Sequence, residues 1–316
     1  MTVGVDDPTQ SDASGGTEPT PGARFGRYEI RELLGAGGMG AVFLANDPLL
    51  ARTVAVKILK SGATDRLLEE GRVMAKLNHP NVIHVYDVGI EGDIAFVAME
   101  HIKGCTLRAW LDTPRTLAEI IDAFAQAGRG LAAAHASGLV HRDFTLTNVM
   151  VDSDGRVVVT DFGLAKNLDD AASTRSGTPA YMSPEQHAGG LTDLRSDVFS
   201  FCVAMWRAVY NQPPFAGETG SEVAESTTKG IITEPREPSR APRRIRRALE
   251  RGLRANPDER WPSMDALVAA LLGRRRRVAI AATAGIAVVA IAAMAVVVTR
   301  PASDPCASAA DRLASI

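Results

Sequence analysis

The sequence predicts an α+β chain with a small β-rich lobe, a larger α-helical lobe and one C-terminal transmembrane helix. Short segments of alternating apolar residues, such as TVAVKIL and IAFVAME, recur between residues 28 and 100 and are typical of strands. One helical pattern, over residues 65–77, interrupts them. After Gly104 long segments rich in alanine and leucine follow, and these favour helices. The third observation is a long uncharged apolar segment near the C-terminus.

The composition is that of an ordinary globular protein. Of the 316 residues, 46% are hydrophobic and 23% are charged, and the formal net charge is only -2. The three cysteines, Cys105, Cys202 and Cys306, have unrelated spacings and indicate neither a disulfide framework nor a zinc site. The six histidines show no pairing on one helix face, so we expect no metal site built from them.

Residues 1–27 are expected to form a disordered tail. They are rich in Gly, Pro, Ser, Thr and Asp and hold almost no large apolar side chains. Such a segment cannot bury enough surface to offset the entropy that is lost on ordering. The start of the chain also lacks the basic and apolar regions of a cleaved signal peptide, so we expect this tail to lie in the cytoplasm.

The apolar segment Val278–Thr299 is predicted to cross a membrane. Its 22 residues carry no charge, and at about 1.5 Å per residue a helix of this length spans a hydrocarbon core of about 30 Å. The alternative, a buried core helix, is usually shorter and rarely free of charge. A basic run at residues 273–277 precedes the segment, and positive charge beside a span stays in the cytoplasm. This explains the arginines without a nucleic-acid partner.

The predicted topology is that of a single-pass protein of the cell membrane. Everything before the span is expected in the cytoplasm, and only residues 300–316 form a short extracytoplasmic tail. That tail breaks off where a helix pattern begins, in CASAADRLASI, which suggests a truncated form of a longer chain.

A glycine-rich segment lies between two predicted strands. GAGGMGAV, at Gly35–Val42, fits the pattern G-x-G-x-x-G-x-V. Glycines let the backbone close over phosphate groups, although a dinucleotide-binding turn contains the same glycines. Here a strand rather than a helix follows, which disfavours a dinucleotide site. A flexible hairpin without a ligand is the alternative reading of this segment.

A lysine ends the predicted strand VAVK, at Val54–Lys57. Lysines at strand ends are usually just solvated. However, Glu70 lies on the following predicted helix, where it could pair with Lys57 and hold the ammonium group against phosphate oxygens. The neighbouring Glu69 is the alternative partner.

Two further motifs supply carboxylates and an amide. In HRDFTLTN, at His141–Asn148, an aspartate stands five residues before an asparagine, and DFG follows at Asp161–Gly163. A carboxylate near the attacking hydroxyl, with an amide and a second carboxylate for metal, is what phosphoryl transfer requires. Mg²⁺ prefers hard oxygen ligands and leaves much of its shell to phosphates, so two protein ligands suffice. The segment GTPAYMSPEQ, at Gly177–Gln186, follows a loop that holds Ser and Thr.

The order and spacing of five motifs match the signature of protein kinases. These motifs are GAGGMGAV, VAVK, HRD with its asparagine, DFG and SPE. The segment from Tyr28 to about Leu272, over three quarters of the chain, resembles the bacterial membrane-anchored serine/threonine kinases of eukaryotic (Hanks) type. The resemblance implies a two-lobed protein kinase fold over residues 28–272. Its N-lobe would span 28–100, its hinge 100–102 and its C-lobe 103–272.

The resemblance also implies the cofactors and the residues that handle phosphate. ATP would be the phosphate donor, with Mg²⁺, or Mn²⁺ in its place, as the metal. Lys57 would bind the α- and β-phosphates and pair with Glu70, while Asp143 would be the catalytic base. Asn148 and Asp161 would be the metal ligands.

A second set of matched residues would enclose the nucleotide. Met99 would be the gatekeeper, followed by the hinge Glu100–Ile102 along the adenine. Residues on both faces of the ring and the glycine-rich segment over the phosphates complete this set: Val42, Ala55, Met150, Gly35, Ala36, Gly37, Gly38, Met39 and Gly40. The apolar members could equally be ordinary core residues, because only their register in the family pattern indicates a nucleotide contact.

Three matched residues are expected to support the fold. Glu185 would form a buried ion pair with Arg260 of NPDERWPSM. Asp197 would anchor the loop His141–Asn148, called the HRD loop below, from underneath. These roles are structural and not catalytic.

Arg142, beside the expected base, suggests control by phosphorylation of the activation loop. A phosphate brings nearly two negative charges, which an arginine cluster can dock. Thr174 is the expected acceptor, with Ser173 and Ser176 as alternatives. A Ser/Thr-rich exposed loop could also be merely soluble. Thr178 favours Ser/Thr substrates over Tyr.

The sequence departs from the family pattern at two positions. Ser/Thr members carry lysine two residues after the catalytic aspartate and then proline, but here Thr145 and Leu146 stand in their places. Loss of one preorganised cation would lower the rate by roughly 10²–10³, by analogy with the deletion of an oxyanion donor. Positioning and metal binding would remain, so we expect impairment rather than abolition, unless Lys166 compensates.

Two functions of different classes follow. The first is an active kinase that phosphorylates itself and cytoplasmic proteins on Ser or Thr in transmembrane signalling. The second is an impaired kinase or pseudokinase that acts as a membrane-tethered ATP-binding scaffold. Thr145 alone favours the scaffold, whereas the enzyme is favoured by the complete set Lys57, Glu70, Asp143, Asn148 and Asp161. A small-molecule kinase is disfavoured by the membrane segment and by GTPAYMSPE, which is typical of a peptide platform. Homodimers are compatible with either function, and no nucleic-acid partner is expected.

Overall fold

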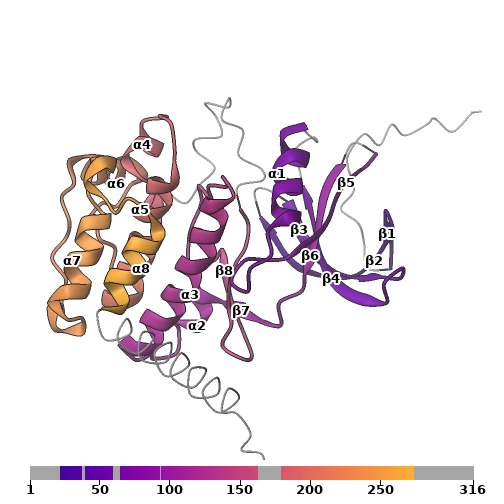
Figure 1. The fold of residues 1–316 in the computed structure, drawn as a ribbon, viewed down its shortest axis with the longest axis horizontal. Coiled ribbons are helices and arrows are strands. Elements are labelled where there is room, and N and C mark those ends of the chain that lie inside the picture. Colours follow the sequence, from indigo (N-terminus) through magenta and orange to yellow (C-terminus); the bar gives the residue numbers. More distant parts are fainter. Residues whose placement is uncertain (1–21, 38–39, 60–64, 93, 163–178, 274–316) are drawn as a thin grey trace, which may run out of the picture. The chain divides into compact units, whose positions relative to one another are not determined.

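The computed structural model describes residues 22–37, 40–59, 65–92, 94–162 and 179–273. For residues 65–70 and 239 it describes the backbone and not the side chains. Within these ranges a β-sheet lobe is followed by a helical lobe (Figure 1). The expected division into a β-rich and an α-rich part is therefore confirmed.

The first lobe is built on a six-stranded antiparallel sheet in the order β1-β2-β3-β4-β6-β5. Neighbours in sequence pair side by side, except that β6 lies between β4 and β5. The helix α1 (Asp65–Lys76) contacts β5 and is seen beside the sheet in Figure 1. The strands are Arg24–Phe25 (β1), Tyr28–Gly37 (β2), Gly40–Asp47 (β3), Arg52–Leu59 (β4), Val85–Glu91 (β5) and Ile94–Glu100 (β6).

Alternation of side chains explains the strands of this lobe. On β3 the side chains of Ala41, Phe43 and Ala45 are buried, and those between them are half-buried. The central strands β4 and β6 are instead apolar along nearly their whole length, because both of their faces are covered. One core cluster joins the strands and includes Tyr28, Ile30, Phe43, Val54, Val56 and Phe96.

The hairpin between β2 and β3 requires a glycine where β3 begins. Gly40 has a φ of +149°, and a Cβ there would lie 2.0 Å from the backbone oxygen of Ile58 on β4. Such a contact is shorter than any that a real Cβ makes, so a larger residue would separate the two strands. The last glycine of GAGGMG thus has a structural reason that is independent of any ligand.

The ordered part of the chain begins earlier than the sequence predicts. We expected residues 1–27 to be disordered, but Arg24–Phe25 pair with β2 as strand β1. Phe25 is buried, and its ring meets that of Phe96 edge to face, with the ring centroids 5.6 Å apart. A two-residue strand is too short to show a periodic pattern, so the sequence did not indicate that these two residues pair with the sheet.

The second lobe packs around the helix α5 (Leu194–Tyr210). Thirteen of its 17 residues are buried, as is typical of a helix in the middle of a core. It contacts α3 (Leu117–Ala136) and α7 (Arg243–Gly252). The remaining helices are α2 (Leu107–Trp110), α4 (Pro184–His187), α6 (Gly220–Lys229) and α8 (Met264–Leu272), with 3₁₀ turns at Pro179–Tyr181, Pro238–Arg240 and Pro257–Glu259.

Side-chain caps set where the important helices begin. At α3 the Thr116 hydroxyl accepts from the Glu119 amide at 3.2 Å, and the Glu119 carboxylate accepts from the Thr116 amide at 2.8 Å. This reciprocal capping box satisfies two backbone donors that the helix leaves unpaired. At α5 the Asp193 carboxylate accepts from the Arg195 amide at 2.7 Å, which fixes the first turn of the helix around Asp197.

A small sheet lies where the two lobes meet. Its strands are β7 (Gly104–Thr106), β8 (Val149–Asp152) and β9 (Val157–Val159), in that order. The backbone of Val159 accepts from Ile83 at 2.9 Å and donates to Asn81 at 3.0 Å, so β9 is hydrogen-bonded to the segment that precedes β5. The other connection runs from β6 to β7 through residues 101–103, next to the expected hinge.

The predicted membrane segment, residues 278–299, lies outside the described residues, as do the arginines at 274–277 and the tail at 300–316. Among the helices that the structure does describe, none combines the length and the apolar character that a membrane crossing needs.

Phe25→Ala is expected to lower the free energy of unfolding by about 3 kcal/mol, because the substitution empties a buried site between β1 and Phe96. Denaturant unfolding of the purified chain measures this change. The matched control is Arg24→Ala, whose exposed ion pair with Glu29 should contribute less than about 1 kcal/mol. Equal effects of the two substitutions would show that β1 does not stabilise the lobe.

Candidate active site

The sheet register brings together several residues expected around a nucleotide. Val42 on β3 stands opposite Lys57 on β4, and Ala55 on β4 stands opposite Met99 on β6. Ala55 and Met99 are buried, and Val42 is half-buried. The fourth apolar residue of the set, Met150, is half-buried on β8. The lobe thus presents an apolar surface next to its lysine.

The glycine-rich hairpin leaves open space on its outer half. Gly35, Ala36 and Gly37 are exposed, and a Cβ at Gly35 or Gly37 would have no neighbour within 4 Å. The tip residues expected to complete the phosphate cover, Gly38 and Met39, lie outside the described residues. Space and a bare backbone are what a phosphate-covering loop requires.

The expected hinge follows directly on β6. The backbone amide of Glu100 donates to the carbonyl of His84 at 2.9 Å, and its carboxylate bonds to Arg156. These bonds hold Glu100 on the first lobe and tie it to the small sheet. Within the part of the chain that the structure describes, the backbone amide of Ile102 donates to no protein acceptor.

The ammonium group of Lys57 lies 2.7 Å from Oδ1 of Asp161. The two residues are 104 positions apart in the chain and come from the two lobes. The Lys57 side chain is 13% exposed and that of Asp161 is 35% exposed, so the contact is partly shielded from water. Glu70, the partner expected from the sequence, belongs to α1, where the side chains of residues 65–70 lie outside the description.

Two non-glycine residues at this site have a left-handed backbone. The φ angles are +63° at Arg142 and +55° at Asp161. Side chains other than glycine rarely adopt this region, and residues that do so are held there by their surroundings at a cost of order 1–3 kcal/mol. Arg142 directly precedes Asp143, so backbone strain is concentrated at both expected carboxylates.

The HRD loop is closed by its own asparagine. Nδ2 of Asn148 donates to the backbone oxygen of Asp143 at 2.8 Å and lies 3.5 Å from Oδ2 of the same residue. The Asn148 carbonyl in turn accepts from Thr160 at 2.9 Å, which places β8 and the Asp161 segment side by side. The structure thus brings Asp143, Asn148 and Asp161 together, as the motif order predicts.

Asp197 on α5 lies beneath the HRD loop and is fully buried. Its two carboxylate oxygens accept from the backbone amides of His141 and Arg142, both at 2.8 Å. Nε2 of His135, at the end of α3, lies 2.7 Å from Oδ2. Asp197 lies where the motifs predict it, whereas His135 belongs to no motif, and its only signal is its position in the last turn of α3.

His141 connects the HRD loop to the Asp161 segment. The Asp143 amide donates to Nδ1 of His141 at 3.3 Å, so this nitrogen is the acceptor. Nε2 then carries the proton and donates it to the carbonyl of Thr160 at 2.9 Å. The ring also packs against Phe162 with the centroids 4.7 Å apart. A single buried side chain therefore joins the residues next to both carboxylates.

Thr145 is buried and bonded within the HRD loop. Its side chain is only 3% exposed, and its hydroxyl lies 2.8 Å from that of the exposed Thr147. Among the described residues, this pairing accounts for the polar atom that replaces the family's lysine. No cation is introduced at this position by the loop itself.

A second buried carboxylate supports the segment SPEQ. Glu185 accepts from both guanidinium ends of Arg260, at 2.8 and 2.7 Å, and from the hydroxyl of Ser196 at 2.7 Å. Burial alone would raise the pKa of the Glu185 carboxyl, but the hydrogen bonds from Arg260 and Ser196 outweigh it and lower this pKa to about 2. Arg260 is itself 1% exposed, so the structure brings the expected pair together in the core.

Gln186 links this segment to the HRD loop. Its side-chain amide donates to the backbone oxygen of Arg142 at 2.8 Å, and its oxygen accepts from the amide of Ser183 at 3.0 Å. Arg142 is thereby held by Asp197 on one side and by Gln186 on the other. Gln186 could not be identified from the sequence, because a linear motif does not show that the backbone carbonyl of Arg142 needs a donor.

The expected regulatory residues Ser173, Thr174, Ser176 and Thr178, and Lys166, all lie outside the described residues. Their predicted roles stay predictions.

The family model of the protein kinase domain matches residues 28–271. The chain belongs to the protein kinase family. The kinase fold, with a β-sheet N-lobe and a helical C-lobe, is therefore shown by the match together with the elements described above.

Curated relatives of this kinase are named serine/threonine-protein kinases. PknA of Mycobacterium tuberculosis is 39% identical over 271 residues, which cover 79% of this chain and 62% of PknA. PknB of Mycolicibacterium smegmatis is 36% identical over 267 residues, covering 77% and 42%. PrkC of Bacillus subtilis is 36% identical over 211 residues, covering 63% and 33%. The chain thus spans less than two thirds of the length of these relatives.

Solved structures with the same fold include Rad53 and the PknI kinase domain. Rad53 1-466 in complex with AMP-PNP has a TM-score of 0.68 at 23% identity, covering 77% of this chain and 64% of that one. A mutant of the PknI kinase domain of Mycobacterium tuberculosis has a TM-score of 0.63 at 24% identity, covering 81% and 98%. At this identity the likeness shows the fold alone.

The kinase family implies ATP and a divalent cation, and the side chains present fit such a metal. Because Nδ2 of Asn148 is bonded to Asp143, the amide oxygen of Asn148 is the atom left to coordinate. Asp161 adds a carboxylate of which one oxygen contacts Lys57. Among the described residues no group of three or more His, Cys, Asp and Glu could hold a metal. Asn148 and Asp161, with phosphate oxygens, are thus the residues suited to Mg²⁺.

Glu185→Gln is expected to lower the free energy of unfolding at pH 7 by about 3–5 kcal/mol, because it leaves the buried Arg260 without a counter-charge. The pKa of Glu185 is depressed in the folded chain, so its stabilisation is complete above its unfolded pKa and is lost as the pH falls towards 2. The difference between wild type and variant should therefore shrink below about pH 4.5.

Urea unfolding between pH 7 and pH 3 measures this difference. The control is Glu225→Gln, which breaks an exposed ion pair with Lys229 and should have a much smaller effect. A difference that stays constant over the whole pH range would contradict a depressed pKa at Glu185.

Proposed function

We propose that the chain is a serine/threonine protein kinase that transfers the γ-phosphate of ATP to hydroxyl groups of proteins, its own included. The observation that carries this proposal is the contact between Lys57 and Asp161 beside the loop that holds Asp143 and Asn148. It unites a phosphate-binding cation, metal ligands and a candidate base from both lobes. The names of the relatives, which are 34–39% identical to this chain, support the acceptor class.

In this proposal each side chain has one task. When bound, MgATP would supply the phosphoryl group, and its metal ion would neutralise the negative charge of that group. Lys57 orients the phosphates, and Asn148 and Asp161 hold the metal. Asp143 accepts the proton of the attacking hydroxyl, with its backbone held by Asn148 and its neighbour Arg142 held by Asp197. Most of the rate enhancement would then come from positioning, which the buried hydrogen bonds provide.

Asp143→Asn is expected to lower kcat by about 10²–10⁴, because it removes the general base and keeps the size of the side chain. The measurement is incorporation of labelled phosphate from ATP and Mg²⁺ into the full chain and into a protein acceptor. Asp154→Asn is the control, since Asp154 is an exposed residue of the turn between β8 and β9. Incorporation by the wild type that is no higher than by Asp143→Asn would overturn the kinase reaction.

Activation is proposed to involve a phosphate on the loop before Gly177, with Thr174 as the acceptor and Ser173 or Ser176 as alternatives. Arg142 supports this proposal, since its backbone is fixed at the site and arginine suits phosphate. Mass spectrometry of the autophosphorylated chain tests it. A phosphate found only outside residues 173–176 would refute it.

The second candidate function is an ATP-binding scaffold with little or no transfer activity. Thr145 favours it, because this residue is buried, bonded to Thr147 and uncharged where the family has lysine. The kinase reaction is nevertheless preferred, since the lost cation would remove a few kcal/mol from a much larger total. The two functions differ in whether bound ATP is turned over.

Thr145→Lys is expected to raise kcat by about 10-fold or more, because it restores a cation beside the transferred phosphate. Steady-state phosphorylation of a protein acceptor measures the change. Thr147→Lys is the matched control. Thr147 is the exposed partner of Thr145, and this substitution adds the same charge two residues away. An unchanged rate in Thr145→Lys, with its fold intact by thermal unfolding, would count against this account of the loop.

The kinase is proposed to be anchored in the cell membrane by residues 278–299, with its catalytic domain in the cytoplasm. The uncharged segment and the arginines before it support this topology. Fractionation of cells that express the full chain or a chain ending at residue 273 tests it. Recovery of both chains in the soluble fraction would refute the anchor. A homodimer is compatible with this arrangement.

A further inference from the structure

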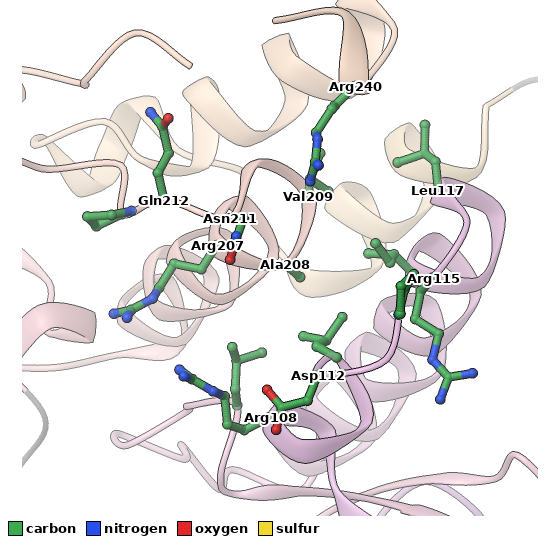
Figure 2. Close-up of a pocket in the computed structure, with 15 residues that line it drawn as sticks. Arg108, Asp112, Arg115, Leu117, Arg207, Ala208, Val209, Asn211, Gln212 and Arg240 are labelled. Carbon is green, nitrogen blue, oxygen red and sulfur yellow. The ribbon is translucent and has the colours of Figure 1, made fainter. Parts of the chain in front are cut away.

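A pocket of about 520 Å³ lies in the helical lobe, outside the residues assigned to phosphoryl transfer. A volume of this size is typical of sites that take a side chain or a small ligand. Its walls come from α2, the start of α3, the HRD loop and the end of α5 with the chain that follows. In Figure 2 Arg108 and Asp112 are seen on the α2 side and Arg207 on the α5 side.

The pocket is strongly basic. Four arginines line it, and among its described lining residues Asp112 is the single acid. Two of the arginines are engaged within the protein. Arg115 stacks on the ring of Trp110, 4.2 Å from its centroid, and donates to its backbone oxygen at 3.1 Å. The second of these, Arg240, donates to the Glu237 carboxylate at 2.8 Å.

The other two, Arg108 and Arg207, form no ion pair with any carboxylate in the described part of the chain. Arg108 is exposed on α2, and Arg207 is half-buried in the last turn of α5. Asp112 lines the same pocket, but the arginines outnumber this one carboxylate, and a concave surface with a net positive charge attracts an anion.

The position of Arg108 links the pocket to the HRD loop. Its backbone amide donates to the carbonyl of Leu146 at 2.9 Å. Leu146 is buried, lines the pocket and stands three residues after Asp143. A group bound between these residues would therefore lie next to the loop that holds the base.

The position of Arg207 links the pocket to the peptide platform. Its guanidinium lies over the ring of Tyr181, 5.1 Å from the centroid, and Tyr181 belongs to the segment Gly177–Gln186. Burial raises the pKa of Tyr181, while the charges of Arg207 and Arg108 act in the opposite direction. Arg207 therefore lies beside the segment Gly177–Gln186.

We propose that this pocket binds an acidic side chain of the protein substrate, near the acceptor hydroxyl, with Arg108 and Arg207 as the recognising residues. Planar guanidinium groups match carboxylates and phosphate monoesters in the same way, so the anion is an aspartate, a glutamate or a phosphorylated residue. This inference rests on the proposed kinase function and adds a substrate class to it. The kinase then prefers acidic peptides.

Peptide binding tests the proposal directly. Four labelled peptides share one threonine and differ only in the flanking residues, which are glutamate, glutamine, lysine or phosphoserine. Fluorescence anisotropy with the full chain should show that the glutamate or phosphoserine peptide binds about tenfold more tightly than the glutamine peptide, and that added salt weakens this preference. Binding of only the phosphoserine peptide would identify the anion as a phosphate.

Two variants assign the preference to the pocket. Arg108→Glu, on the exposed surface of α2, and Arg207→Gln should each abolish it, whereas Arg108→Lys should retain part of it. The control is Arg247→Glu, which makes the same change of charge on an exposed residue of α7 that does not line the pocket. In phosphorylation assays the loss should appear in KM, with kcat for the glutamine peptide unchanged.

Equal binding of the glutamate and glutamine peptides by the wild type would overturn the inference. So would an undiminished preference in Arg108→Glu. Binding is measured without catalysis, and the two proposals can therefore fail separately. An acidic preference in a chain that transfers no phosphate would refute the kinase reaction and support the pocket.

Discussion

The geometry of the site depends on the buried carboxylate of Asp197. Two of its donors are consecutive backbone amides, His141 and Arg142, so the carboxylate fixes a backbone conformation rather than a side chain. A charge buried this deeply is stable only when several donors surround it. Here the donors are the groups whose placement aims Asp143. The position of Asp143 therefore depends on the packing of the core helix α5, which carries Asp197.

The two lobes meet at the site through a contact of a different kind. Lys57 and Asp161 form a charge-assisted hydrogen bond, in addition to the backbone bonds that join Asn81 and Ile83 to Val159. Arg142 and Asp161 have a strained backbone on the C-lobe side. The carbonyl of Arg142 accepts from Gln186, and that of Thr160, next to Asp161, accepts from His141. The C-lobe thus holds Asp143, Asn148 and Asp161 through hydrogen bonds, and the N-lobe brings Lys57 against Asp161.

Much of the site was predictable, because phosphoryl transfer needs particular residue types and the chain carries them in a recognised order. Asp143, Asn148, Asp161, Asp197 and the pair Glu185 and Arg260 could be named from motifs. Linear patterns do not show which backbone group needs a donor. For that reason His135, Gln186 and Ser196 were missed, although each bonds to a residue that was named.

The sequence did not show strand β1, the basic pocket or the bonding of Thr145, for different reasons. Strand β1 escaped notice because two residues carry no periodicity, and only the packing of Phe25 against Phe96 shows that they belong to the sheet. The basic pocket escaped notice because Arg108 and Arg207 are 99 residues apart and are brought together by the fold. At Thr145 the sequence showed the missing cation, but only the structure shows that the replacing hydroxyl is already engaged.

The pair formed by Glu185 and Arg260 has a consequence for how the chain is made. The two residues are 75 positions apart, and Arg260 lies close to the end of the domain. During synthesis the sheet of the first lobe and the whole HRD loop leave the ribosome well before their last support does. Until Arg260 emerges, the Glu185 carboxylate has only Ser196 to compensate its burial. The helical lobe is therefore completed late, and a pause before residue 260 would leave the Glu185 carboxylate without its guanidinium partner.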